Sequence, residues 1–414
     1  MFDNLLPLVA AVIVPLVKIA ILIGALMTAA AYLVLLERWI AAWVQDRLGP
    51  NRVGPLGLLQ PLADGLKFIF KEEYTPAHVD KFLFILAPIV ILTAALAIFA
   101  VIPFGSVLPP LGLEAYGVKD PIRLIVAPGV DVGLVYVFAL SSVAVYGVIL
   151  GAWASNSKYS FLGGLRSSAQ LIAYEIPLGL GILGVVLYSG SLDLEHIISA
   201  QATSGVWNVF TQPLGFVVFM VASFAESARL PFDLPECEQE LIGGYHTEYA
   251  GMKLLLFLIA EFLHMVVAAF LIVILFFGGW HLWGVTGSGD EVNWFQAIAR
   301  IAVLVAKIMA AIVFFMMVRW SWPRFRFDQL MSLAWKVMLP LGLLNLAAVA
   351  VISETMQSAE SPTSPWIVAG WGWAVLLVGW IGAALAAPLH DDNRPRQNTR
   401  EFDVEEEIAS GVKP

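Results

Sequence analysis

Long apolar runs separated by short polar segments dominate the 414-residue chain. Nine of these runs approach the roughly 20 residues that an α-helix needs to cross a bilayer. The pattern predicts helices at Leu6–Leu36, Phe82–Phe104, Val130–Ala154, Ala169–Tyr188, Phe210–Phe224, Leu254–Phe277, Ile298–Trp320, Trp335–Ile352 and Trp366–Ala387. The first run is long and contains Lys18, so we expect that helix to tilt strongly or to project beyond the bilayer. The fold class expected is an all-α polytopic transmembrane helix bundle.

The predicted helices follow one another without a linker long enough to separate two domains, and no internal repeat is visible. We therefore expect a single transmembrane bundle over residues 1–389. Residues 390–414 are polar and then acidic, so we expect a disordered cytoplasmic tail. Asp3 precedes the first run without a basic region or a cleavage signal, which favours a retained helix.

Composition supports a membrane protein. Hydrophobic residues make up 59% of the chain and charged residues 13%, whereas soluble proteins carry about a quarter charged residues. The net charge of −9 comes from buried acids and the tail, and we expect no nucleic-acid partner. The single cysteine, Cys237, excludes an internal disulfide, and no Cys or His spacing predicts a metal site.

Lys and Arg are distributed unequally between the two sides of the predicted bundle. With the N-terminus outside, the cytoplasmic loops hold 14 of these residues and the tail holds four more. The opposite loops hold only Lys119, Arg123 and Arg300. The positive-inside rule therefore predicts an external N-terminus and a cytoplasmic C-terminus.

An acidic segment, residues 225–251, lies between two apolar runs. Its basic residues are Arg229 and His246. Its six acidic residues are Glu226, Asp233, Glu236, Glu238, Glu240 and Glu248. Charges at membrane depth are costly, so this segment must contact protein, water or a partner. One interpretation is a solvated loop. Because apolar residues such as Phe232 and Tyr245 interrupt the acids, we favour a packed cluster that handles protons.

Two further carboxylates lie inside apolar runs. Glu175 is close to Pro177, and Glu261 has His264 three residues later on the same helix face. Intramembrane acids are functional candidates, although structural pairing explains Glu261 equally well, with Lys307 and Lys18 as the expected cations. Together with the acidic segment, these residues predict a chain of coupled carboxylates. Such a chain serves as a proton relay or as a charge-sensitive switch, and the sequence does not separate the two.

The first polar loop predicts an amphipathic helix from Leu58 to Lys71 that lies in the membrane interface. A helix that merely anchors the loop fits equally well, and Asp64 is expected to pair with Arg38, Arg47 or Arg52. A later loop, residues 318–336, mixes Arg with Trp and Phe. Such loops anchor at lipid headgroups or dock a partner.

Long motifs identify a family resemblance. From about Glu37 to Asn345 the chain contains, in order, ER, QDRLGPNRVGPLGLLQPLADGLK, WASNSKYSFLGGLRSSAQLIAYEIPLGL, AESARLPFDLPECEQELIGGYHTEYAGMK, FFGGW and VRWSWPRFRFDQLMSLAWKVMLPLGLLN. This set resembles the H-subunit family of the proton-pumping NADH:quinone oxidoreductase, respiratory complex I. The resemblance implies eight helices, and the ninth predicted helix at the C-terminus lies beyond this family pattern. It also implies a bacterial inner-membrane subunit that anchors a peripheral arm and frames a quinone chamber.

The resemblance also assigns roles to individual residues. It implies a proton path through Glu175, Glu226, Glu236, Glu238, Glu240 and Glu248, to which we add Glu261 because it lies inside an apolar run. It implies a quinone chamber formed by Glu37, Arg38, Arg47, Asp64, Lys67, Arg229, Phe232 and Asp233. The quinone is a shared substrate, whereas flavin and iron–sulphur clusters belong to partner subunits. The expected partners are the peripheral-arm quinone-site subunits, the small membrane subunits and membrane lipids.

Two features depart from the family pattern. Trp39 occupies a position where the family often has a basic residue, and the helix at 366–387 with its acidic tail extends beyond the eight-helix pattern. We interpret the additional helix as packing against lipid or a neighbouring subunit. Alternative functions are the related membrane subunit of an energy-converting hydrogenase-type complex, a free-standing secondary transporter and a purely structural anchor.

Overall fold

The computed structural model describes residues 5–109, 122–233, 242–283, 285–287, 292–358 and 364–386. Regular structure in these ranges is helical apart from one isolated bridge between Val107 and Arg123. The α-helices are α1 (Leu5–Val44), α2 (Gln60–Phe70), α3 (Lys81–Ile98), α4 (Gly133–Ala154), α5 (Lys158–Ser189), α6 (Leu194–Ser204), α7 (Asn208–Thr211), α8 (Pro213–Glu226), α10 (Gly251–Phe276), α11 (Trp294–Ser321), α12 (Phe327–Ser332), α13 (Leu339–Ser358) and α14 (Pro365–Ala386). Short helical segments lie at Pro55–Gly57, Gly244–His246 and Leu333–Met338.

Eight helices in the described ranges are long and apolar enough to cross a membrane, and α8 is a shorter apolar helix. The predicted all-α polytopic bundle is confirmed, and the chain is a multi-pass membrane protein. The predicted ninth helix corresponds closely to α14. Helical structure continues from Phe327 through Met338 into α13, so the eighth helix begins earlier than the predicted Trp335.

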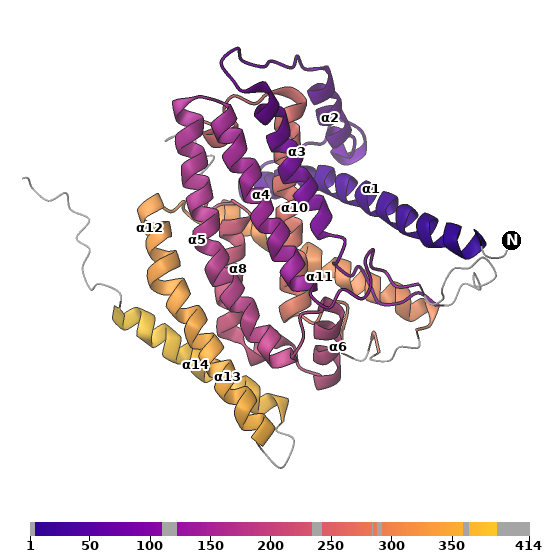
Figure 1. The fold of residues 1–414 in the computed structure, drawn as a ribbon, viewed down its shortest axis with the longest axis vertical. Helices are drawn as coiled ribbons and strands as arrows, with labels where there is room; N and C mark the ends of the chain where they lie inside the picture. The colour runs from indigo at the N-terminus through magenta and orange to yellow at the C-terminus, as the bar shows by residue number, and fades with distance from the viewer. Residues whose placement is uncertain are drawn as a thin grey trace, which may run out of the picture.

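The helix α10 lies in the middle of the bundle (Figure 1). Its second half is continuously buried from Met265 to Phe276 because every side of the helix meets another element. It packs against α1, α3, α6, α8 and α11. A helix that is apolar all round is expected to be enclosed by protein or lipid, and here protein encloses it.

Glycines bring α3, α4, α5 and α8 close together. A Cβ at Gly147 of α4 would lie 3.0 Å from the backbone nitrogen of Ile91 in α3. A Cβ at Gly181 of α5 would lie 3.1 Å from the carbonyl oxygen of Gly215 in α8. Small residues at such crossings let membrane helices approach at backbone distance. The candidate site described below lies between these same helices.

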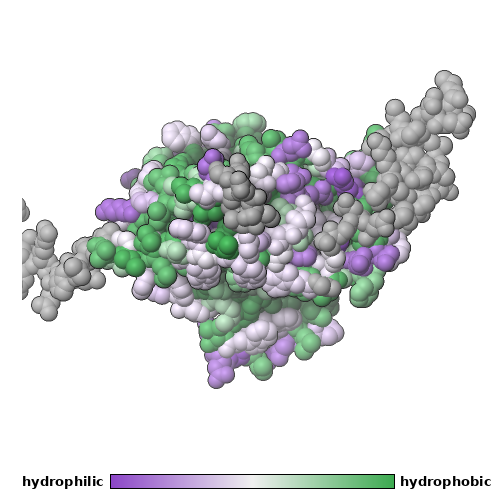
Figure 2. Space-filling model, turned by 90° about the horizontal axis from the view of Figure 1, so that it is seen from below, coloured by the Kyte–Doolittle hydropathy of each residue, from purple (hydrophilic) through white to green (hydrophobic). Residues whose placement is uncertain are grey.

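The peripheral helices expose apolar side chains. α1 runs at a wide angle to α3, α4 and α5, as its length predicts (Figure 1). Its outer positions expose large apolar residues such as Leu16 and Ile21, and α14 exposes Trp371 and Trp380. Viewed from below, hydrophobic and weakly polar residues cover most of the visible coloured surface (Figure 2). Lipid or neighbouring subunits must cover so large an apolar surface.

Two parts of the fold differ from the sequence prediction, and a third predicted part lies outside the described residues. The helices α6 and α7 were not predicted; α6 is capped by Asp193, whose side chain accepts a hydrogen bond from the Glu195 amide at 3.1 Å. The helix α5 begins at Lys158 rather than at Ala169. The predicted tail at 390–414 lies outside the described residues, as do Glu236, Glu238 and Glu240.

Candidate functional site

The bundle has two ends with different contents. The α2 end comprises the loops at 45–80, 155–157, 227–233 together with 242–250, and 322–326. The α6 end comprises the described parts of the segments 99–132, 190–212 and 277–293. At the α2 end, the Asp80 amide donates to the carbonyl of Ala154, and Asn156 donates to the carbonyl of His78. These bonds join loops that are far apart in sequence and fix the helix ends that carry the candidate site.

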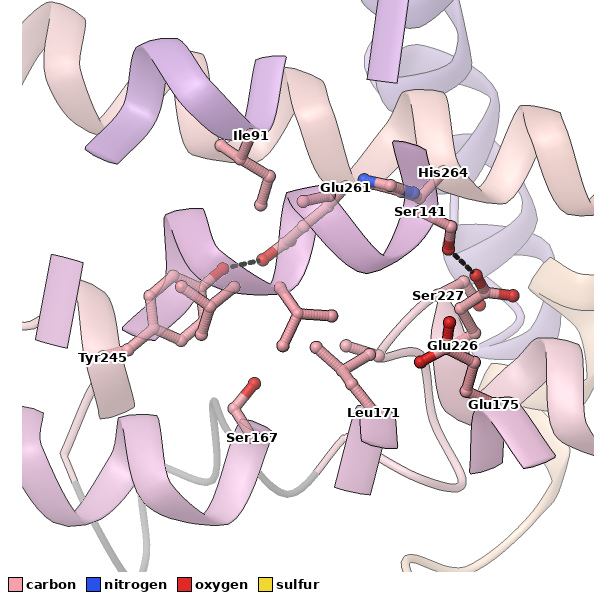
Figure 3. A pocket seen from close by; sticks show the side chains of 14 residues that line it. Ile91, Ser141, Ser167, Leu171, Glu175, Glu226, Ser227, Tyr245, Glu261 and His264 are labelled. Carbon is pink, nitrogen blue, oxygen red and sulfur yellow. Dashed lines mark hydrogen bonds between the residues drawn. The ribbon is translucent and has the colours of Figure 1, made fainter. Parts of the chain in front are cut away.

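A small cavity of about 50 Å³ opens between α3, α4, α5, α8 and α10 near the α2 end. We call it the carboxylate cavity because Glu175, Glu226 and Glu261 line it, together with His264 (Figure 3). A volume of this size has room for about three waters. The remaining lining residues are Ile91, Ser141, Ala144, Val145, Val148, Ser167, Leu171, Ser227, Ala228 and Tyr245.

Helix periodicity explains how these side chains reach one cavity. Ser167, Leu171 and Glu175 are spaced by four residues along α5 and therefore share one face. Glu261 and His264 are three residues apart on α10 and also share a face. Glu226 is the last residue of α8, where the apolar helix gives way to the turn at Ser227 and Ala228.

Each of the three carboxylates has a hydroxyl partner. The hydroxyl of Ser141 donates to Glu226, and the hydroxyl of Tyr245 donates to Glu261 at 2.6 Å (Figure 3). The hydroxyl of Ser142 donates to Glu175. Glu175 and Glu226 come from different helices, yet they lie close enough to interact electrostatically. Hydrogen-bonded acids that interact at membrane depth share protons as a group.

The segment that supplies Tyr245 is held by aromatic packing. Tyr249 stacks on Phe84 of α3 with a ring-centroid distance of 4.0 Å, and Phe257 of α10 packs edge-on against both Tyr245 and Tyr249. Burial raises the pKa of the Tyr249 hydroxyl above its usual range, so this residue stays neutral and serves as an anchor. Phe232, Tyr245 and Tyr249 of the acidic segment are therefore buried, as the sequence predicts, whereas Ile242 is exposed.

A second and larger hollow of about 590 Å³ lies next to the first. We call it the arginine cavity because Arg38, Arg47, Arg229 and Arg319 line it, together with Glu37. The side chains of Glu37 and Arg229 are about one-tenth exposed, and their charged atoms are 3.3 Å apart.

Glu37 is the counter-charge of two arginines. Arg229 of the 227–233 loop and Arg319 of α11 both donate to its carboxylate. The guanidinium of Arg229 also lies over the ring of Phe262, 4.2 Å from its centroid. Glu261 lines both this cavity and the carboxylate cavity. A carboxylate thus stands between an arginine-lined hollow and a buried cluster of acids.

The predicted quinone-chamber residues are only partly brought together. Arg38 pairs with Asp64 of α2 at 2.7 Å, which is the predicted ion pair, whereas Lys67 points outward as an exposed residue. Phe232 is buried and stacks on Phe325 with centroids 5.4 Å apart. Neither Phe232 nor its neighbour Asp233 lines the arginine cavity.

The remaining predicted site residues have other surroundings. Asp233 pairs with Arg324 across 3.3 Å, which joins the 227–233 loop to the segment after α11. Glu248 follows the short helix Gly244–His246 and does not line the carboxylate cavity. The amphipathic segment is confirmed as the helix α2, which exposes Leu62, Leu66 and Phe70.

The prediction that Lys307 and Lys18 supply cations for the buried acids is wrong. Lys307 donates to the carbonyls of Phe277, Gly279 and His281 at 2.6–3.0 Å, at the α6 end. Lys18 donates to two carbonyls of the 123–125 segment. Both ammonium groups are satisfied by backbone oxygens. Sequence spacing gives no information on depth within the bundle, and free carbonyls at helix ends compete for cations.

Sequence reasoning missed the hydroxyl partners of the acids and the role of Arg319. Ser141 and Ser142 form a polar pair inside the otherwise apolar stretch VFALSSVAV, and this pair is the signal that was available. Arg319 was expected to contact lipid or a partner rather than Glu37. Such long-range pairs, here between α1 and α11, are set by tertiary packing and leave no local pattern.

A third hollow is almost wholly apolar. It measures about 680 Å³ and lies along α1, α10 and α11, from Lys18 at the α6 end to Trp39 and Leu58 at the α2 end. We call it the apolar groove. Its length and lining suit an isoprenoid or acyl chain. In the described ranges, no group of three or more His, Cys, Asp or Glu residues is arranged to hold a metal ion.

Comparison with known proteins gives consistent results. The family described as NADH dehydrogenase matches residues 17–350. The chain is 47% identical over 341 residues to an H subunit of the NADH-quinone oxidoreductase of Geobacter metallireducens, covering 82% of this chain and 96% of that protein. It is 47% identical over 317 residues to the H subunit of the same name from Cytophaga hutchinsonii (77% and 90%). It is 44% identical over 339 residues to subunit 8 of the Rhodothermus marinus NADH-quinone oxidoreductase (80% and 94%).

Proposed function

This chain belongs to the NADH dehydrogenase family, with the H subunits of NADH-quinone oxidoreductase, and from that membership we propose that it frames part of the quinone chamber and couples quinone reduction to proton translocation. It is a membrane subunit of a proton-translocating oxidoreductase, and its partners include the other subunits of complex I. Membership of this family sets aside the hydrogenase-type and free-standing transporter alternatives.

The observation that carries this proposal is the position of Glu261. Its carboxylate lines the arginine cavity on one side and the carboxylate cavity on the other. Addition of electrons to a quinone near the α2 end creates negative charge that arginines stabilise and that carboxylates oppose. A proton taken up to balance that charge is shared among Glu261, Glu226 and Glu175. The carboxylates Glu236, Glu238, Glu240 and Glu248 extend this proton path in the proposal.

The quinone headgroup is proposed to approach the arginine cavity, with Glu37, Arg38, Arg47, Asp64, Lys67, Arg229, Phe232 and Asp233 forming or supporting that wall. The exposed apolar face of α2 and the apolar groove support this placement, because a long isoprenoid tail needs a continuous apolar surface. We propose that the loops at the α2 end also anchor the peripheral arm. Flavin and iron–sulphur clusters would then belong to that arm.

The replacement Glu261→Gln tests the coupling role in the purified complex. It keeps the size and the hydrogen bond from Tyr245 but removes the ionisable group. We measure quinone reductase turnover and proton pumping in vesicles. We expect at least one of these rates to fall about tenfold or more. The matched control is Asp131→Asn, which neutralises an exposed carboxylate at the α6 end.

Two outcomes distinguish the alternatives. If Glu261→Gln lowers pumping while Asp131→Asn leaves it unchanged, the carboxylate itself takes part in coupling. If both variants reduce quinone and pump protons at the original rates, Glu261 has no part in coupling. The acids then serve as ion-pair partners, and the purely structural anchor becomes the better description.

A further inference from the structure

Two adjacent serines of α4 contact two different carboxylates. Consecutive residues of an α-helix point about 100° apart, so neighbours along the chain address different surroundings. Ser141 turns into the carboxylate cavity and donates to Glu226 of α8. Ser142 donates to Glu175 of α5. One dipeptide therefore connects to acids from both neighbouring helices.

Burial makes these contacts energetically important. The side chain of Ser141 is buried, and Ser142 is half-buried within an apolar helix. A hydrogen bond to a charged group contributes more than one between neutral groups, and its loss in a buried place leaves the partner unsatisfied. The serines are thus the immediate hydrogen-bonding environment of Glu226 and Glu175. The only other groups of comparable polarity lining the described cavity belong to Ser167, Ser227, Tyr245, Glu261 and His264.

Ser142 has two acceptors within reach but a single hydroxyl proton. Its oxygen lies 3.0 Å from the carbonyl of Phe138, one turn earlier in α4, and also contacts Glu175. A serine hydroxyl is a donor and an acceptor at once. When Glu175 is ionised, Ser142 donates to it. When Glu175 carries a proton, the carboxyl group donates to Ser142, and the serine proton turns to the Phe138 carbonyl.

We propose that Ser141 and Ser142 are positioning residues for proton transfer between Glu226 and Glu175, with the hydroxyl of Ser142 reorienting as Glu175 gains or loses its proton. The proton leaves the carboxyl group of Glu226 and ends on the carboxylate of Glu175, so the charge of the pair is conserved. Ser141 holds Glu226 toward the cavity throughout. This inference rests on the proposed coupling function and adds two uncharged residues to it.

The test uses four serine variants of the assembled complex, together with Glu175→Gln and Glu226→Gln. Ser142→Ala removes the hydroxyl, Ser142→Thr retains it, and Ser141→Ala removes the partner of Glu226. Ser155→Ala is the matched control, because this buried serine at the end of α4 donates to the Gly151 carbonyl at 2.7 Å and lies outside the carboxylate cavity. Subunit composition and thermal stability of each purified complex verify assembly. If Ser142→Ala fails to assemble, Ser142→Cys replaces the hydroxyl by a thiol, which is only a weak hydrogen-bond donor.

The first readout is infrared difference spectroscopy of the complex during quinone reduction. The carbonyl stretch of a protonated carboxyl group responds to its hydrogen bonds, and the variants Glu175→Gln and Glu226→Gln assign the bands. We expect the Glu175 band to move in Ser142→Ala and to stay in Ser142→Thr and Ser155→Ala. The second readout is the pH profile of pumping, which we expect to shift in Ser141→Ala and Ser142→Ala, together with a roughly tenfold loss of rate, and to stay unchanged in Ser155→Ala.

The outcomes separate this inference from the function on which it rests. If the Gln variants lower pumping but Ser141→Ala and Ser142→Ala leave both the bands and the pH profile unchanged, the serine inference is wrong and the proposed function stands. If Glu175→Gln and Glu226→Gln both pump at the full rate, the coupling function and the serine inference fail together. A shifted band that Ser142→Thr restores supports the inference.

Discussion

Glu37 is a single carboxylate that pairs with two arginines, the buried Arg229 and the half-buried Arg319. Arg229 and Arg319 approach it from different parts of the chain, so α1, the 227–233 loop and α11 meet at one charge. Removing one partner of a buried ion pair costs more than the pair itself contributes, because the remaining charge stays buried. Here one substitution leaves two cations without their counter-charge.

We therefore expect Glu37→Gln to destabilise the protein by about 3–5 kcal/mol. The measurement is the thermal denaturation of the purified complex, compared with the unmodified complex at the same pH and salt concentration. The control is Asp64→Asn, which breaks the Arg38–Asp64 pair, whose side chains are 45% and 27% exposed. That loss should stay within about 1 kcal/mol. Equal effects of the two variants would contradict the assignment of Glu37 as the central counter-charge.

At the residue scale, the sequence predicted which acids lie together better than it predicted their contacts. Density of carboxylates in an apolar setting was enough to single out Glu175, Glu226 and Glu261, because charge is costly at membrane depth. The partners of these acids were not predictable. Hydroxyl donors such as Ser142 are common in membrane helices, and only the packing of α4 against α5 decides which serine meets an acid.

Among the elements, α8 and α14 depend on each other. A 14-residue helix is about 21 Å long, which is less than the roughly 30 Å hydrocarbon thickness. The chain before α8 therefore reaches into the bundle as the short α7 and the bend at Gln212. Gln212 donates to the Gly184 carbonyl, and Asn208 donates to the Leu275 carbonyl. The helix α14 packs over this bend and over α8.

Gly372 is the contact point of α14 with this bend. A Cβ at this position would lie 2.1 Å from the carbonyl oxygen of Thr211, whereas a Cβ at Gly382 would meet nothing within 4 Å. We expect Gly372→Leu to push α14 away and to lower stability by about 1–3 kcal/mol. Gly382→Leu, in the same helix, should have no effect. Thermal denaturation and subunit retention measure both, and a Gly372→Leu complex as stable as its control would contradict this packing.

At the element scale, the sequence predicted the helices that are long enough to cross a membrane. Each long apolar run became a helix, and the family match ends at residue 350, before α14 begins. The helices α6 and α7 were missed because residues 190–212 are mixed in polarity. Their positions depend on caps and on contacts with α10, such as the bond from Gln201 to the Ile274 carbonyl at 2.9 Å.

For the whole molecule, the distribution of charge defines two ends. The α2 end holds the arginine cavity and the α6 end has few basic side chains, as the loop asymmetry predicted. We propose on this basis that the α2 end faces the bacterial cytoplasm and that the N-terminus is external. All residues of one loop lie on the same side of the membrane. Reporters fused before and after α14 therefore test the proposed orientation.

A fluorescent protein that matures only in the cytoplasm should be bright when fused after residue 414 and dark when fused after residue 364. An alkaline phosphatase reporter, which is active only outside the cytoplasm, should give the opposite pattern. Two fusions with the same reporter activity would contradict a membrane crossing by α14. A uniformly inverted pattern would reverse the proposed orientation and place the carboxylate cavity near the external face.

The hydrogen bonds of Lys307 limit how the helix α11 can move. Lys307 of α11 bonds the carbonyls that follow α10, and Arg300 of the same helix bonds the Thr286 carbonyl and the hydroxyl of Ser106. These bonds fasten the first half of α11 to the carbonyls of residues 277–281, to the Thr286 carbonyl and to the Ser106 side chain, and sliding there would break several charge-assisted bonds at once. We therefore expect any movement of α11 during turnover to occur as bending of its second half, toward the α2 end, because its first half is held in place.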